Sequence, residues 1–177
     1  MNEAVQKYVD RILGYTKGQK PLKVQAATAS TLARLVKDVP ASKLRKRPTP
    51  EQWSVTEILA HLADSEVVCG WRLRAILGAP GTAIEAYDQD AWNLAGHYST
   101  RNASECIDQF RAMRKANLLL LNSLTPEQWG LYGMHSERGK ETVEHIVSLI
   151  AGHDLNHVQQ IERILAAPKK KPARLAA

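Results

Sequence analysis

The sequence contains few cysteines, few aromatic residues and no long apolar run. Only two of its 177 residues are cysteine, and the aromatic residues are four Trp, five Tyr and one Phe. Cys69 and Cys106 form neither a disulfide framework nor a CxxC metal or redox pair. The longest uncharged apolar stretch, residues 116–121, is far too short to span a bilayer, and the charged N-terminus does not look like a signal peptide. We therefore expect a soluble, cytoplasmic protein with no membrane association.

The excess of positive charge is local. The chain has 24 Lys and Arg against 18 Asp and Glu, but eight of the basic residues lie in segments 43–47 and 169–174. Without these two segments, 16 basic and 18 acidic residues leave the rest of the chain slightly acidic. Because a nucleic-acid-binding domain presents a continuous basic face, we do not expect a nucleic-acid partner. Weak binding of phosphates by the basic C-terminal segment is the alternative.

Apolar residues recur at helical spacing along most of the chain, and strand patterns are nearly absent. The second predicted helix carries an apolar stripe of Ile58, Leu59, Leu62 and Val67, with Trp71 and Leu73 as candidates to extend it. Residues 81–101 show no clean period. We expect one domain over residues 1–167, followed by a basic, flexible C-terminal tail at 168–177 that is dispensable for folding. The four predicted helices span residues 24–36, 54–77, 103–124 and 141–166.

A five-residue repeat supports a bundle of helices. Thr-Pro-Glu-Gln-Trp occurs at residues 49–53 and again at 125–129, and each copy precedes a major helix. Thr-Pro-Glu is a good helix-start signal, with a cap residue, Pro at the first position and an acid near the helix dipole. Five identical residues favour duplication of a helix pair. The sequence therefore predicts an all-α fold, a four-helix bundle.

The most informative polar pattern is a pair of histidines four residues apart. His153 and His157 lie on one face of the last predicted helix, in line with the apolar stripe of Ile150 and Ile161. His61 lies near the edge of the apolar face of the second predicted helix. If these two helices are neighbours, His61 supplies a third nitrogen close to the pair.

Three buried imidazoles have a definite chemical use. A buried imidazole needs a hydrogen-bond partner or a metal to offset its desolvation. Three neutral imidazoles on a divalent ion leave coordination positions open, which is typical of catalytic zinc and suits nickel, iron or manganese nearly as well. The motif is not the H-E-x-x-H of zinc proteases, because Asp154 follows His153. From spacing alone, a metal site and a pair of satisfied core histidines both remain open.

The flanks of these histidines are similar to those of a known family. Two segments carry the likeness, Trp53-Ser54-x-x-Glu57-x-x-x-His61-Leu62-Ala63-Asp64-Ser65-Glu66 and His153-Asp154-x-x-His157-x-x-Gln160-Ile161, with Tyr87-Asp88-Gln89-Asp90-x-Trp92 and Gly133-x-His135 between them. Over residues 20–167 the chain resembles the DinB-like (DinB/YfiT-like) superfamily. The resemblance implies an up-down-down-up four-helix bundle, often a homodimer, with one divalent ion held by His61, His153 and His157. Zinc or nickel is expected first, and iron or manganese are the alternatives.

The resemblance also bounds the function. Members of this family include transferases and isomerases that use a low-molecular-weight thiol, and proteins named as metal-dependent hydrolases. It implies a metal-dependent enzyme acting on a small-molecule substrate, with a low-molecular-weight thiol as a candidate partner. The alternative is a non-catalytic metal- or ligand-binding module of a stress response. No catalytic residue and no substrate follow from the sequence.

Other polar residues are candidates for lesser roles. Ser54 and Glu57 match a helix capping box, so capping is the preferred role of Glu57. His135 could approach the open coordination positions, whereas His97 is expected to be exposed and His145 to be packed or on the surface. Candidates for orienting the ligand imidazoles are Asp64, Asp154, Asn156 and Gln160. Residues expected to pack in the core or at helix starts are Cys69, Trp53 and Trp129.

Overall fold

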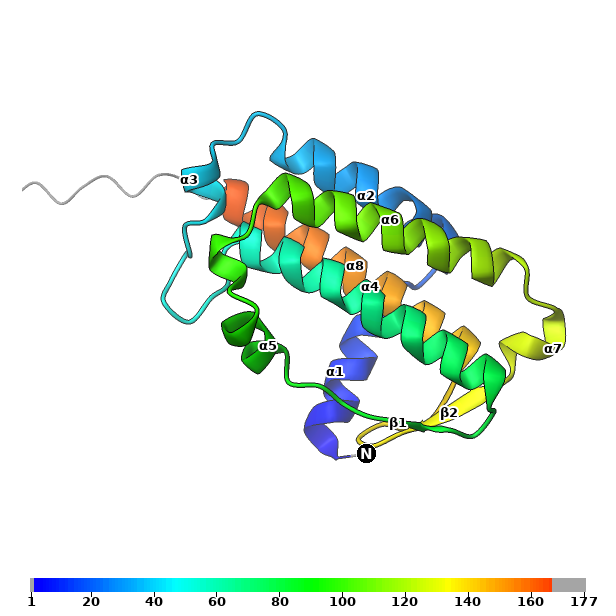
Figure 1. Ribbon diagram of the computed structural model, residues 1–177. Coiled ribbons are helices and arrows are strands. Elements are labelled where there is room, and N and C mark those ends of the chain that lie inside the picture. The colour runs from blue at the N-terminus through cyan, green and yellow to red at the C-terminus, as the bar shows by residue number, and fades with distance from the viewer. Residues whose placement is uncertain (1, 167–177) are drawn as a thin grey trace, which may run out of the picture.

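Four long helices form the body of the protein. The computed structural model describes residues 2–166, so the predicted tail at 168–177 lies outside the described residues. Helices α2 and α8 run in one direction and α4 and α6 in the other (Figure 1), which is the predicted up-down-down-up bundle. No helix within residues 2–166 is both long enough and apolar enough to cross a membrane. The four helices are α2 (Pro21–Val36), α4 (Val55–Gly78), α6 (Ala103–Asn122) and α8 (Val143–Ala166).

The helix that carries His61 begins at a capping box, as predicted. The Ser54 Oγ accepts from the Glu57 amide, and the Glu57 carboxylate accepts from the Ser54 amide at 2.8 Å. Glu57 is buried and also pairs with Arg47, so both oxygens of its carboxylate accept hydrogen bonds at the helix start. The second copy of the repeat forms a short helix of its own, α7 (Pro126–Trp129), which also has a capping box.

A small three-stranded sheet is present, although the sequence shows almost no strand pattern. Strand β2 (Tyr132–His135) lies between β1 (Ala83–Ile84), which is parallel to it, and β3 (Gly139–Thr142), which is antiparallel. These strands have two to four residues, too few to produce a recognisable alternation in the sequence. The predicted last helix accordingly begins at Val143, and residues 141–142 belong to β3. The remaining short elements are α3 (Ala41–Leu44), α5 (Gln89–Ala95) and a 3₁₀ turn, η1 (Tyr98–Thr100).

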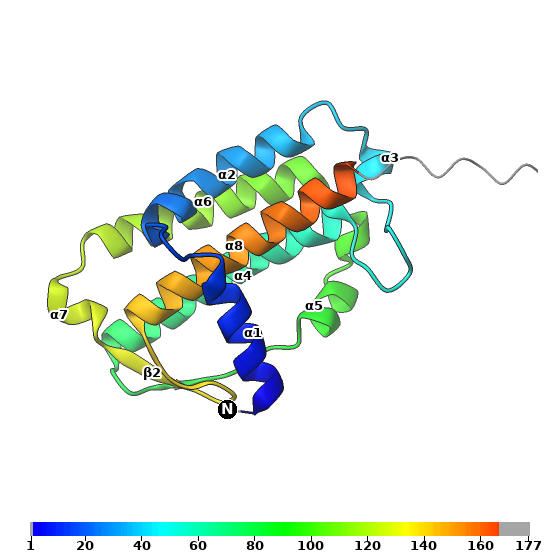
Figure 2. The same ribbon diagram turned by 180° about the vertical axis from the view of Figure 1, so that it is seen from behind.

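An N-terminal helix that the sequence pattern did not reveal crosses α8. Helix α1 (Glu3–Gly14) packs on α8 outside the bundle (Figure 2), with Val9 and Ile12 buried in the contact. The crossing depends on Gly152, because a Cβ at this position would overlap the backbone carbonyl of Ile12. Helix α1 is thereby held beside the α8 turn that carries the histidine pair.

The core consists of two apolar clusters, one toward each end of the bundle. Trp53 packs against the first and Trp129 against the second, as expected of residues at helix starts. Cys69 is buried in the second cluster, also as expected. The predicted stripe on α4 is wrong at its outer positions, because Val67 is 47% exposed and Trp71 is 70% exposed.

Candidate metal centre

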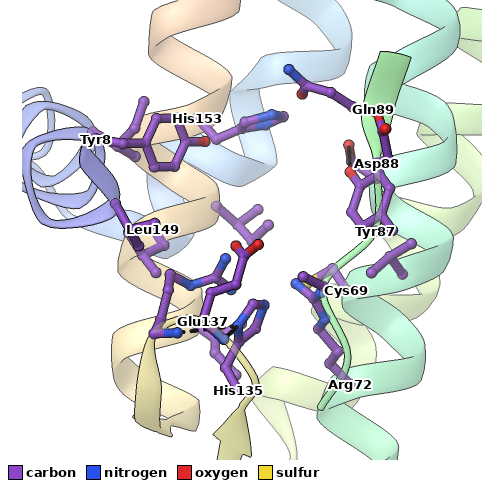
Figure 3. A pocket seen from close by; sticks show the side chains of 18 of the residues that line it. Tyr8, Cys69, Arg72, Tyr87, Asp88, Gln89, His135, Glu137, Leu149 and His153 are labelled. Carbon is purple, nitrogen blue, oxygen red and sulfur yellow. Dashed lines mark hydrogen bonds between the residues drawn. The ribbon is translucent and has the colours of Figure 1, made fainter. Parts of the chain in front are cut away.

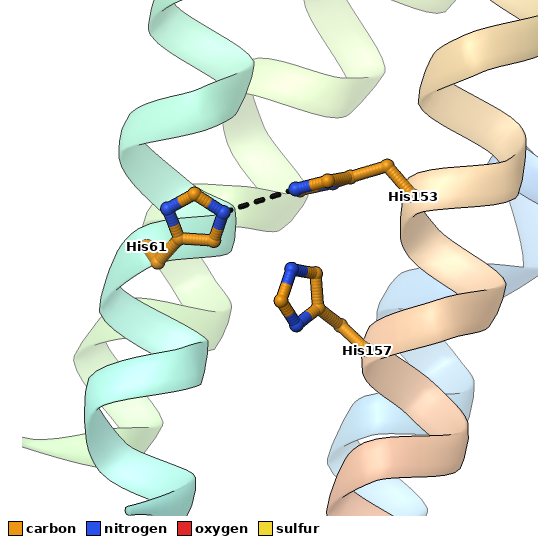
Figure 4. A group of neighbouring side chains, drawn as sticks. All are labelled: His61, His153 and His157. Carbon is orange, nitrogen blue, oxygen red and sulfur yellow. Dashed lines mark hydrogen bonds between the residues drawn. The ribbon is translucent and has the colours of Figure 1, made fainter. Parts of the chain in front are cut away.

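The structure brings His61, His153 and His157 together. His61 projects from α4, and the other two project from successive turns of α8 toward it (Figure 4). One ring nitrogen of each histidine lies within 4.8 Å of the others, and the Nε2 atoms of His61 and His153 are 3.0 Å apart. His61 is only 2% exposed. Helix α8 therefore covers the edge of the apolar face of α4 near which His61 was expected.

The spacing of these nitrogens fits a single divalent ion. Imidazole nitrogens about 2 Å from a tetrahedral ion are about 3.3 Å from one another. The 3.0 Å separation between the two Nε2 atoms is close to that value, and small rotations of His157 would bring its nitrogen into range. The donor set is chemically suitable as well, since zinc and other first-row divalent metals accept neutral imidazole.

Burial keeps the three imidazoles neutral. It lowers the pKa of His61 to about 3, with repulsion from His157 as a second cause. Burial likewise lowers the pKa of His157 to about 4, although its hydrogen bond to Gln160 acts in the opposite direction. For His153, burial and the neighbouring histidines place the pKa well below its usual range. Neutral imidazoles keep the lone pairs that a metal requires.

Of the four residues expected to orient the ligands, Gln160 contacts one. Its Oε1 lies 2.9 Å from His157 Nδ1, so the imidazole donates from Nδ1 and keeps a lone pair on Nε2. The other three bond elsewhere: Asp64 to Tyr98 and Arg101, Asp154 to Arg114 and Thr28, and Asn156 to Arg11. The expectation that these three face the imidazoles is not met by the described contacts.

A cavity of about 510 Å³ opens beside the histidines. Its walls come from α1, α4 and α8 and from the segments 86–89 and 135–138, as Figure 3 shows. His61 and His153 line it, so a small molecule in the cavity would reach them. His135 lines the same cavity but does not belong to the group of three. His97 is exposed and His145 is half-buried near Glu141, as expected for residues outside the site.

A buried charged network behind the histidines was not expected. Arg114 of α6 lies between Asp154 of α8, at 2.6 Å, and Glu66 of α4, at 2.8 Å. Thr28 donates to Asp154, and Asn117 donates to Glu66. The sequence of α6 does contain a signal for this network, because two polar residues interrupt its buried apolar stripe. The stripe consists of Ile107, Phe110, Arg114, Asn117 and Leu121.

Acidification should destabilise the metal-free protein. An unfolded chain titrates its histidines near 6.5, whereas burial lowers the pKa of His61 to about 3 and of His135 and His157 to about 4. The unfolded state then binds more protons between these values. Stability is therefore complete above about pH 6.5 and is lost as the pH falls toward 4. Urea midpoints at pH 7.5, 6 and 5 measure this, and a His97→Asn variant, altered at an exposed histidine, should show the same slope.

Comparison with known proteins places this arrangement in a family. A model described as the DinB superfamily matches residues 26–161. YfiT of Bacillus subtilis, named a putative metal-dependent hydrolase, is 27% identical over 63% of this chain and 64% of its own length. A protein of Oceanobacillus iheyensis with the same functional name is 23% identical over 76% of this chain and 78% of its own length. In this sequence match the chain spans just under two thirds of the length of YfiT.

Two solved structures share the fold. YfiT from Bacillus subtilis, described as having an unusual four-helix bundle topology, superposes with a TM-score of 0.77 at 23% identity, over 81% of this chain and 83% of YfiT. A mycothiol-dependent maleylpyruvate isomerase superposes with a TM-score of 0.65 at 11% identity, over 80% of this chain and 59% of the isomerase. The family model covers most of the sequence, and the bundle topology agrees with it. The chain belongs to the DinB superfamily.

Proposed function

We propose that the protein is a metal-dependent hydrolase of a small molecule, with one divalent ion held by His61, His153 and His157. The observation that carries the proposal is the convergence of three neutral imidazoles, one buried and two half-buried, beside a cavity large enough for a substrate. The names of the relatives in Bacillus and Oceanobacillus support the same reaction class. Zinc or nickel is the proposed ion, and iron or manganese would suit the same ligands.

The residues around the three histidines have distinct roles in this proposal. A bound divalent ion would supply a Lewis acid that lowers the pKa of a coordinated water. Gln160 holds the ring of His157 through Nδ1, and the rings of Trp53 and His61 pack edge to face with their centres 5.1 Å apart. The Ser65 hydroxyl lies 3.5 Å from His61 Nε2 and 3.1 Å from the Tyr87 hydroxyl. These two hydroxyls line the cavity and are placed to hydrogen-bond a polar group of the substrate.

Transfer or isomerisation through a low-molecular-weight thiol is the second candidate. Its support is the likeness of fold to the mycothiol-dependent isomerase, together with a cavity that has room for a thiol beside His61 and His153. Neither cysteine of the chain provides that thiol, since Cys69 and Cys106 are both buried and burial raises the pKa of each. The thiol would have to be a diffusible molecule.

Metal analysis combined with a small reaction panel tests both candidates. The full-length protein should purify with about one divalent ion per chain and should hydrolyse a member of an ester and amide panel. Turnover only when a thiol such as glutathione is added would favour the second candidate. Stoichiometric metal with tight ligand retention and no turnover would support the alternative, a non-catalytic binding module.

We also propose that the protein is a homodimer. The family resemblance suggests it, and Val67 and Trp71 leave apolar surface exposed on α4. Light scattering at tens of micromolar should give twice the chain mass of 19.7 kDa. A monomer mass under these conditions would contradict the proposal.

A further inference from the structure

The cavity has a second polar end, three helical turns along α4 from His61. Arg72 follows His61 by 11 residues, a rise of about 16 Å along the helix axis. Figure 3 shows Arg72 and His135 at the opposite end of the cavity from His153. Apolar side chains make up much of the remaining lining of the cavity: Val5, Ile12, Val68, Ile146, Leu149 and Ile150.

Arg72 is a half-buried cation without a carboxylate partner. Its guanidinium donates to the backbone carbonyl of Glu85 at 2.7 Å and lies 5.9 Å from the centre of the Tyr87 ring. Within residues 2–166 it makes no ion pair. Burial and the nearby Arg138 lower its pKa, which shows that the charge is held at a cost. An anion placed beside Arg72 would offset that cost.

His135 supplies a hydrogen-bond donor that has no acceptor. The ring is 3% exposed, and its Nδ1 lies 3.2 Å from the amide of Glu137 and 3.4 Å from the amide of Arg138. Both amides donate, so Nδ1 must accept and the ring proton of the neutral imidazole lies on Nε2. Among the described residues, Nε2 is buried with no hydrogen-bond partner. Such a donor carries a desolvation penalty that an incoming acceptor would remove.

The other charges around this end do not satisfy Arg72. Arg138 donates to the buried Glu141 from Nε at 2.7 Å and from Nη2 at 2.9 Å, so that pair is close to neutral. Glu137 and Asp88 also line the cavity, but both are exposed to solvent. Water screens their charges more strongly than it screens a buried one. Arg72 is therefore a half-buried charge of this lining that has no ion-pair partner within residues 2–166.

We infer that Arg72 and His135 form a subsite for a carboxylate of the substrate, with the reacting group lying at the three histidines. One cation and one neutral N–H match a single negative charge, whereas a phosphate dianion would need further donors. Subtracting the reach of the Arg72 side chain from the rise between His61 and Arg72 along α4 leaves roughly 10 Å. The apolar walls therefore fit a carboxylic acid with a hydrocarbon body of that length. The assignment of the reacting end rests on the proposed function, but the carboxylate subsite itself does not.

Carboxylate binding to the full-length protein tests the subsite directly. Calorimetric titration with hexanoate, in the presence of EDTA so that no metal takes the carboxylate, should give saturable binding to one site. Hexanamide, which has the same body without the charge, should bind at least 10-fold more weakly. Arg72→Gln should weaken hexanoate binding at least 10-fold, and Arg34→Gln, which removes an exposed arginine of α2, should leave it unchanged. Equal binding by hexanoate and hexanamide, or by wild type and Arg72→Gln, would overturn the inference.

A second variant isolates the histidine donor. In His135→Asn the amide oxygen takes the position of Nδ1 and still accepts from the two backbone amides, but the Nε2 donor is gone. Hexanoate should bind this variant several-fold more weakly. In the wild type, ¹⁵N NMR of histidine should show His135 protonated at Nε2 and shifted by hexanoate. A proton on Nδ1, or a His135 resonance unmoved at saturation, would contradict the role of His135.

Two further titrations distinguish the carboxylate subsite from binding at the histidines and from a phosphate site. The His61→Ala/His157→Ala variant should still bind hexanoate, so failure of the metal site would leave the subsite standing. Loss of hexanoate binding in that variant, with retention in Arg72→Gln, would show that the acid binds at the histidines instead. Hexyl phosphate should bind more weakly than hexanoate, and tighter binding would replace the carboxylate assignment with a phosphate site.

Discussion

Replacement of His61, His153 or His157 by alanine should lower the affinity for zinc more than about 100-fold. Loss of a residue that only orients a metal ligand typically costs 10- to 100-fold in affinity, and loss of the ligand itself costs more. All three imidazoles contribute a neutral nitrogen to one place, so no single one is dispensable. Competition titration with a chromophoric chelator measures the affinities, and His97→Asn serves as the matched control because His97 is exposed and lies outside the cluster.

Metal should also stabilise the wild type much more than the variants. An ion that bridges α4 and α8 binds only the folded state, so saturating zinc raises the melting temperature by mass action. The single variants should respond much less. Stoichiometric zinc in the His61→Ala/His157→Ala protein would refute the ligand assignment.

The three single alanine substitutions should destabilise the metal-free protein to different extents. His61 is 2% exposed and packs against Trp53, whereas His153 and His157 keep partial exposure. His61→Ala should therefore leave the most enclosed void and the lowest melting temperature of the metal-free variants. An equal or smaller loss for His61→Ala than for His153→Ala would contradict this order.

Arg114→Met should be the most destabilising single change outside the apolar core, costing about 3–5 kcal/mol of unfolding free energy. Arg114 is 3% exposed and is the cation between Glu66 and Asp154, which are 2% and 1% exposed. Removing it leaves two buried carboxylates that repel each other and have lost their strongest donors. Urea unfolding at pH 7 provides the measurement, and the deficit should shrink at lower pH as the carboxylates take up protons.

A triple variant provides the control for this network. Arg114→Met combined with Glu66→Gln and Asp154→Asn removes all three charges at similar volume, and it should recover most of the lost stability. A single Arg114→Met variant that loses less than about 1 kcal/mol would show that water reaches the network and screens it. Zinc affinity of the triple variant should stay close to that of the wild type, because none of the three side chains contacts the ligand imidazoles.

Local sequence signals determined most of the bundle. Helical periodicity placed the long helices within a few residues of α2, α4, α6 and α8, and the Ser54–Glu57 capping box located the start of α4. The four-residue spacing of His153 and His157 placed both on one face of α8. These features depend on contacts within one or two helical turns, so they can be recognised in the sequence without knowledge of the partners.

The tertiary structure decided everything that depends on which elements meet. The three-stranded sheet joins residues 83–84 to residues 132–142, and its strands are too short for periodicity to reveal them. Helix α8 buries His61 by packing over the edge of the apolar face of α4. Helix α1 crosses α8 at Gly152 and forms one wall of the cavity. The ion pair of Arg114 with Asp154 and the shared cavity of Arg72 and His135 join residues 40 or more positions apart. Their energies come from burial and charge pairing between distant segments, which no local pattern encodes.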